Sequence, residues 1–115
     1  MSSFWRKDLI DPALDEQTLG AIREQKTWIS HEPSNPRPYH NLAQLYRIQA
    51  RADEALALEL HAVTLDTDFG PAHVALAEMY AVRGDYSAAW RHARAAEAAG
   101  DGKAVAMLAR QGVGE

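Results

Sequence analysis

Apolar and small residues recur along this chain at intervals of three and four, the spacing of one face of an α-helix. The first clear stripe consists of Tyr39, Leu42, Ala43 and Tyr46. It follows Asn35-Pro36, a typical helix start, because Asn caps free backbone donors and Pro suits the first helical position. The pattern predicts a helix from residue 36 to about residue 50.

The same pattern returns once further along the chain, at a constant offset. The first copy consists of Tyr39, Leu42, Ala43, Tyr46, Ala55 and Ala62. Adding 34 to each position gives His73, Leu76, Ala77, Tyr80, Ala89 and Ala96. A period of this length is typical of a helix-turn-helix unit that recurs along a chain.

Helix starts and stops divide the rest of the sequence. Proline after Gly70 suits a first helical turn, Gly84 suits the end of a helix, and Asp85 suits the cap of the next one. We therefore expect further helices at about 53–66, 70–83, 86–99 and 103–111. The last of these is predicted to cover the exposed end of the second repeat.

The N-terminal third follows the same phase less closely. Subtracting 34 from Ala55, Leu56, Ala62 and Asp66 gives Ala21, Ile22, Trp28 and Glu32. We therefore predict a helix from about Pro12 to Ser30, acting as the second helix of an incomplete repeat. The alternative is a plain amphipathic helix that packs in another register.

The two copies resemble the tetratricopeptide repeat family, in which an aromatic residue, Leu, a small residue and Tyr precede two small residues. The resemblance is strong over 36–101, weak over 12–35 and absent from 1–11. It implies an all-α fold, a short right-handed α-solenoid with an N-terminal helix in 12–35, repeats at 36–69 and 70–101, and a capping helix in 102–115. Glu59 and Ala93 stand where large apolar residues are usual, and Ala50 stands where glycine is usual.

The resemblance also implies that the first helix of each repeat lines a concave groove for a peptide or protein segment. The groove positions in the first repeat are Arg37, His40, Asn41, Gln44, Arg47 and Ile48. Those in the second are Val74, Glu78, Ala81 and Val82. A partner with an acidic or carboxylate end and an apolar remainder would suit both halves. The alternative is an ordinary solvated helix face. Replacing His40 and Arg47 by alanine is expected to weaken partner binding with the melting temperature nearly unchanged.

The N-terminal segment 1–11 is a second candidate for binding. It holds four large apolar residues, Phe4, Trp5, Leu9 and Ile10, without a helical period long enough to bury them. The segment could fold back on its own helices, fill the groove of another copy, or dock elsewhere. An exchange between copies would give a homo-oligomer and a self-assembling scaffold.

Composition narrows the function further. A chain of 115 residues with 47% hydrophobic residues can form one domain with a modest core. Its formal charge of −4 argues against nucleic acid and anionic membranes as partners, since both require a basic surface. The chain has no cysteine, no signal-peptide pattern and no membrane-spanning run, so we expect a soluble, cytoplasmic protein.

No motif of catalysis or metal binding stands out. The histidines show no pair at helical ligand spacing, and His73 occupies a packed position of its repeat. Phosphate-binding loops and nucleophile elbows are also absent from the sequence. We therefore expect no enzyme, no metal and no cofactor. The leading hypothesis is a non-enzymatic adaptor that binds a protein or peptide.

Overall fold

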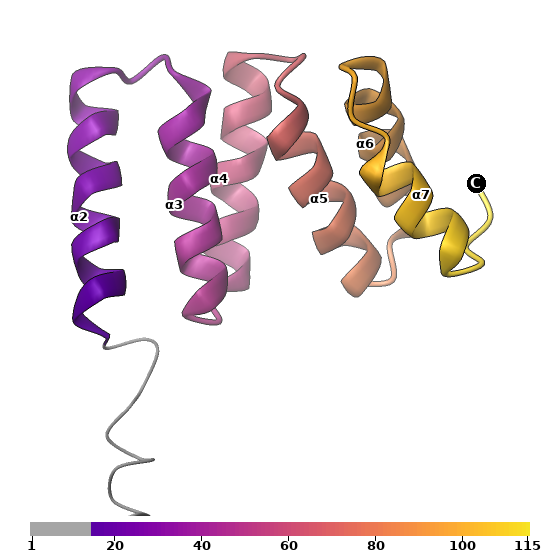
Figure 1. Ribbon diagram of the computed structural model, residues 1–115, viewed down its shortest axis with the longest axis horizontal. Coiled ribbons are helices and arrows are strands. Elements are labelled where there is room, and N and C mark those ends of the chain that lie inside the picture. The colour runs from indigo at the N-terminus through magenta and orange to yellow at the C-terminus, as the bar shows by residue number, and fades with distance from the viewer. Residues whose placement is uncertain (1–14) are drawn as a thin grey trace, which may run out of the picture.

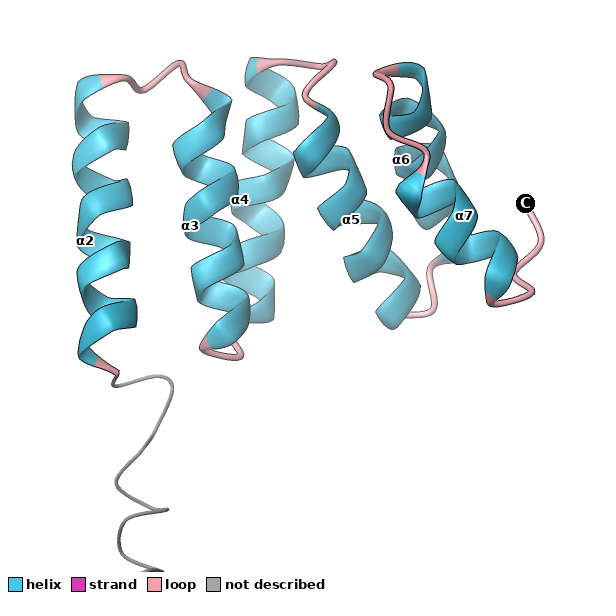
Figure 2. Cartoon of the chain, in the orientation of Figure 1, coloured by secondary structure: helices cyan, strands magenta, loops and turns pink. Residues whose placement is uncertain are grey.

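The computed structural model describes residues 15–115, and the regular structure in that range is entirely α-helical (Figure 2). The helices, numbered from α2 as in Figure 1, are α2 (Glu16–His31), α3 (Pro36–Ile48), α4 (Ala52–Leu65), α5 (Gly70–Val82), α6 (Tyr86–Ala98) and α7 (Lys103–Arg110). The predicted all-α class is confirmed. The predictions for Phe4, Trp5, Leu9 and Ile10 lie outside the described residues.

Local capping explains where several helices begin. The side chain of Asn35 accepts a hydrogen bond from the Arg37 backbone nitrogen at 2.9 Å, at the start of α3. The side chain of Asp85 accepts one from the Ala88 backbone nitrogen at 3.1 Å, at the start of α6. Each cap satisfies a backbone donor that a helix start would otherwise leave unpaired.

Each helix packs mainly on its neighbours in sequence. The most extensive contacts join α3 to α4 and α5 to α6, while α4 meets α5 and α7 meets both α5 and α6. The starts of α5 and α6 follow those of α3 and α4 by the same offset that separates the two copies of the sequence pattern. In Figure 1, α3, α5 and α7 form a row, with α4 and α6 behind it. The molecule is a flat, elongated body of 50 × 39 × 20 Å.

Small and apolar positions of the two copies form the core. Those that the structure buries are Leu42, Ala43, Tyr46, Ala55, Ala62, His73, Leu76, Ala77, Ala89 and Ala96. Because the alanines at these contacts are short, neighbouring helices can approach closely. Ile22 of α2 joins the cluster around Leu42 and Tyr46. Trp90, which is 7% exposed, supplies volume beside Ala93.

A matched pair of substitutions tests the strain in the two repeat turns. Ala50 has a φ of +60°, whereas Gly84, at the equivalent position of the second repeat, has +79°. A side chain in this region is strained by about 1 kcal/mol, so Ala50→Gly should raise the free energy of unfolding and Gly84→Ala should lower it, each by about that amount. Urea unfolding followed by circular dichroism measures both.

A Cβ at Gly84 would meet no atom within 4 Å, so the cost there comes from the backbone alone. If both substitutions shift stability in the same direction, the turns differ in some way other than φ.

Candidate functional site

Two hollows lie along the row of α3, α5 and α7. The hollow near the starts of these helices has a volume of about 210 Å³ and is lined in part by His40, Gln44, Val74, Glu78, Asp101 and Lys103. The hollow near their ends has a volume of about 350 Å³ and is lined by Arg47, Glu78, Ala81, Val82, Met107 and Gln111. Glu78 borders both hollows, so they form one continuous surface. We call it the α3–α5–α7 face.

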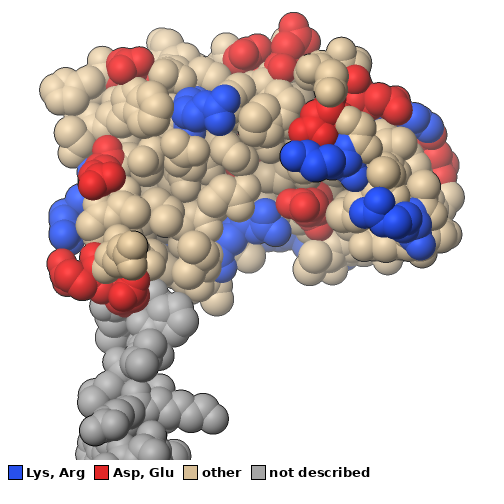
Figure 3. All heavy atoms as spheres, viewed as in Figure 1, with Lys and Arg blue, Asp and Glu red and all other residues tan. Residues whose placement is uncertain are grey.

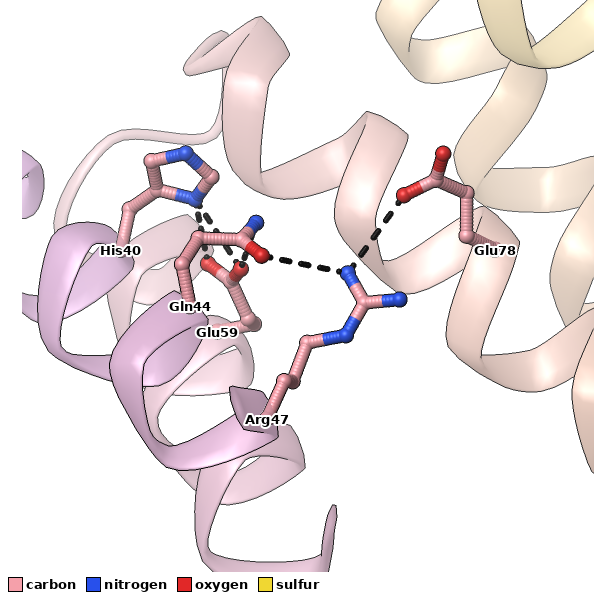
Figure 4. Close-up of polar contacts among 5 residues, drawn as sticks. All are labelled: His40, Gln44, Arg47, Glu59 and Glu78. Carbon is pink, nitrogen blue, oxygen red and sulfur yellow. Dashed lines mark hydrogen bonds and ion pairs between the residues drawn. The ribbon is translucent and has the colours of Figure 1, made fainter. Parts of the chain in front are cut away.

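A row of polar contacts runs beneath and along this face (Figure 4). Nδ1 of His40 lies 2.9 Å from each carboxylate oxygen of Glu59, which belongs to α4. Gln44 donates to the same carboxylate at 3.4 Å and accepts from Arg47 at 3.3 Å. Arg47 also reaches Glu78 at 3.5 Å. These contacts link α4, α3 and α5 through their side chains.

Glu59 is the buried member of this row, with an exposed fraction of 0%. Burial raises the pKa of its carboxyl group, while the hydrogen bond and charge of His40 oppose that shift. A buried carboxylate needs such donors, because its desolvation is otherwise costly. His40 is therefore turned inward, and its side chain is only 14% exposed.

The structure brings most of the predicted groove residues together. Those that line the two hollows are His40, Gln44, Arg47, Val74, Glu78, Ala81 and Val82. Their side chains come from α3 and α5, as the helical spacing predicts.

Three other predicted residues do not line the two hollows. Asn41 donates to Gln25 of α2 at 3.1 Å, so it contributes to helix packing. The Arg37 guanidinium lies 5.0 Å from the centre of the Phe69 ring. Ile48, near the other end of α3, has an exposed fraction of 56%.

Helix α7 contributes to the face in a way that the sequence did not predict. Lys103, Met107 and Gln111 line the hollows at a spacing of four residues. The sequence assigned this helix only to covering the second repeat. A usable signal was its start, which follows the start of α5 by about one repeat length. By that spacing, α7 takes the place of the next first helix in the series.

An apolar hollow extends the face near the ends of α3 and α5. It has a volume of about 350 Å³ and is lined by Arg47, Ala52, Met79, Val82 and Arg83. Val82 is 86% exposed, which is unusual for a large apolar residue. The face therefore changes from polar contacts near His40 to apolar surface near Val82.

Charges on the face are mixed. Figure 3 shows acidic and basic side chains interspersed toward the α7 end, without a continuous patch of one sign. Lys103 lies 3.5 Å from Asp101, in addition to the Arg47–Glu78 pair. Within residues 15–115, no three or more metal-ligating side chains are grouped to hold an ion, and no helix has both the length and the apolarity to cross a membrane.

A histidine pair lies in the core of the second repeat. Nε2 of His73 donates to the Thr67 carbonyl oxygen at 2.7 Å, and its Nδ1 lies 3.0 Å from Nδ1 of His92. The His92 ring also stacks on Tyr80, with centres 5.6 Å apart. Burial and the charge of His73 lower the pKa of His92 to about 4. The prediction that His73 is a packed imidazole is confirmed.

Comparison of the chain with protein-family models, with curated proteins and with solved structures gave no match.

Removing His40 should reveal how strongly Glu59 depends on it. His40→Ala leaves the buried carboxylate with fewer donors, so the free energy of unfolding should fall by about 3 kcal/mol. Adding Glu59→Leu removes the charge as well and should bring stability back to within about 1 kcal/mol of the original chain. Urea unfolding at pH 7 measures both variants.

Arg47→Ala is the matched control, because Arg47 is half-buried and its loss should cost less than about 1 kcal/mol. An equally small loss for His40→Ala would contradict the inferred burial of the pair. The double replacement of His40 and Arg47 should therefore lower the melting temperature, contrary to the expectation from sequence.

The pH dependence of folding should carry the signature of His92. Its pKa falls from 6.5 to about 4 on folding, so the unfolded chain binds the proton more tightly. Stability should therefore fall as the pH drops from 6.5 toward 4, by about 1 kcal/mol between pH 7 and pH 5 once solvent screening is allowed for. The variant His92→Asn keeps a hydrogen-bonding group near Nδ1 of His73 but does not titrate. It should therefore lose less stability than the original chain when the pH falls.

Urea unfolding of the original chain and of His92→Asn, each at pH 7 and pH 5, measures the two losses of stability. The difference between these losses is the contribution of His92. Glu59 acts in the opposite direction, since its raised pKa favours folding at low pH, but it is common to both chains. An equal loss of stability in acid for both chains would contradict the role assigned to His92.

Proposed function

We propose that this chain is a non-enzymatic adaptor whose α3–α5–α7 face binds an extended segment of a partner protein. The observation that carries the proposal is the ordered row from His40 through Gln44 and Arg47 to Glu78, which borders open hollows. The side chains of this row are held in place by one another. They are thus arranged to recognise a segment that lies across the row.

In this proposal the helices form a short right-handed α-solenoid of tetratricopeptide-like repeats. The supporting observations are the constant offset between the two helix pairs and the packing of each helix on its sequence neighbours. The α3–α5–α7 row then corresponds to the concave side of the solenoid. In such arrays the inner surface typically holds an extended peptide.

The partner segment should combine an acidic group with apolar side chains. Near the start of α3, Arg37 lies over an aromatic ring and has no acidic partner within residues 15–115. At the other end, Val82 and Met79 border the apolar hollow. A carboxylate near Arg37 and apolar side chains near Val82 would match both ends.

A self-assembling scaffold is the second candidate. The exposed apolar side chain of Val82 favours it, since such a residue commonly marks a contact surface when it borders an apolar hollow. In that case the occupant would be the N-terminal segment of another copy, with Phe4, Trp5, Leu9 and Ile10. The same face would then join identical chains.

Selection from a random peptide library on the full chain tests the adaptor. Enriched peptides should bind with micromolar affinity, measured by fluorescence anisotropy. Arg47→Glu and Glu78→Arg should each weaken them by about tenfold, the value of one charge-assisted hydrogen bond. Lys26→Glu on α2, outside the face, is the matched control and should leave affinity unchanged within about twofold.

Light scattering accompanies the binding assay. A monomeric chain with peptides sensitive to Arg47→Glu and Glu78→Arg supports the adaptor. An oligomer that becomes monomeric when residues 1–11 are removed supports the scaffold instead. Peptides insensitive to both substitutions would overturn the α3–α5–α7 face as the binding site.

A further inference from the structure

Another hollow lies on α6, separate from the α3–α5–α7 face. It has a volume of about 570 Å³ and is lined by Ser87, Trp90, Arg91, Arg94 and Glu115. The first four residues recur at intervals of three, one and three, so they share one face of α6. None of the five lines a hollow of the α3–α5–α7 face.

The hollow already holds a carboxylate. Arg94 donates through Nε at 2.9 Å to one oxygen of Glu115 and through Nη2 to the other. Its Nη1 donates to Glu97 at 3.0 Å. Two parallel bonds from one guanidinium are the geometry by which proteins recognise carboxylates. The hydrogen bonds from Arg94 also lower the pKa of Glu115.

Arg91 and Trp90 border the same hollow. Arg91 is exposed and makes no hydrogen bond or ion pair with the part of the chain that the structure describes. Trp90 is only 7% exposed, yet its Nε1 has no acceptor within residues 15–115. Buried donors are nearly always paired in folded proteins. The hollow thus combines one cation paired with a carboxylate and one unpaired cation, beside the side chain of Trp90.

The end of the described chain brings Glu115 to this place. Gly112 has a φ of +71°, and Val113 donates to the Leu108 carbonyl oxygen at 3.1 Å. Val113 also packs against the cluster that contains Trp90 and Leu108. This turn directs the chain back across α6, so the contact of Glu115 with Arg94 follows from apolar packing two residues earlier.

The contact is also easy to displace. Arg94 and Glu115 are both about half exposed, and exposed ion pairs contribute little net stability because water competes for both groups. An incoming carboxylate would exchange one Arg94 pair for another. It would gain Arg91 in addition, which Glu115 leaves unused.

We propose that this face of α6 is a second binding site, which takes an acidic segment of a protein partner, and that Glu115 is its internal competitor. One carboxylate of the segment replaces Glu115 on Arg94, and a neighbouring carboxylate pairs with Arg91. Trp90 supplies an apolar wall. The site goes beyond the proposed function, since it lies on a different helix and would let the chain hold two partners.

A fluorescein-labelled peptide of six glutamates tests the site by fluorescence anisotropy with the full chain at low salt. Glu115→Gln removes the competitor and should tighten binding by about threefold or more. Arg94→Gln and Arg91→Gln should each weaken it by about fivefold or more, because each removes one cation from the site. Arg110→Gln, an exposed cation on α7, should leave it unchanged within about twofold.

Unchanged or weaker binding by Glu115→Gln would overturn the competitor role. Equal weakening by Arg110→Gln and Arg91→Gln would show non-specific attraction to positive charge, and would overturn the site. Arg91 has no partner to lose, so Arg91→Gln keeps the test valid even if Arg94→Gln unfolds.

Arg47→Glu separates this site from the α3–α5–α7 face. The proposal expects it to leave binding of the glutamate peptide unchanged. If Arg47→Glu abolishes that binding and Arg91→Gln does not, the acidic peptide occupies the α3–α5–α7 face and the α6 site is overturned. The result of the peptide-library experiment, which tests the α3–α5–α7 face, does not depend on this outcome.

Discussion

The close approach of neighbouring helices is the constraint on which the rest of this structure depends. Ala43 and Ala77, and likewise Ala55 and Ala89, occupy equivalent positions of the two repeats and are fully buried at helix contacts. Only short side chains allow helix axes to come within about 8–10 Å. A larger residue at one of these positions would push a helix outward. Because each helix packs on its sequence neighbours, the α3–α5–α7 row would shift with it.

Glu59, buried between the closely packed helices, orients side chains of the α3–α5–α7 face. A leucine there would avoid the cost of burying a charge, so the carboxylate is not explained by stability alone. Its contribution is orientation, since it holds His40 and Gln44, and Gln44 in turn accepts from Arg47. Side chains that are ordered before a partner arrives lose less conformational entropy on binding. In the proposed function, the departure from the apolar repeat pattern is therefore what prepares the face.

The helices could be predicted from sequence because their causes are local. Stripes of apolar residues and caps such as Asn35 and Asp85 act within one or two turns. The site could be predicted only in part. Asn41 follows His40 directly in sequence, but it lies on a different side of α3 and donates to Gln25 of α2. The sequence does not show where α2 packs, so it could not predict this contact. Glu59 and Lys103 were missed because their neighbours come from other helices.

Helix α7 connects the two proposed sites. Lys103 and Met107 line the α3–α5–α7 face, and the turn at Gly112 and Val113 carries Glu115 to Arg94. As the last described helix, α7 packs mainly on α5 and α6, so fewer contacts hold it than hold the inner helices. A ligand that holds α7 against α5 also fixes the turn that places Glu115. Occupation of the α3–α5–α7 face would then strengthen the competitor on α6, and by linkage an acidic segment on α6 would weaken binding at that face.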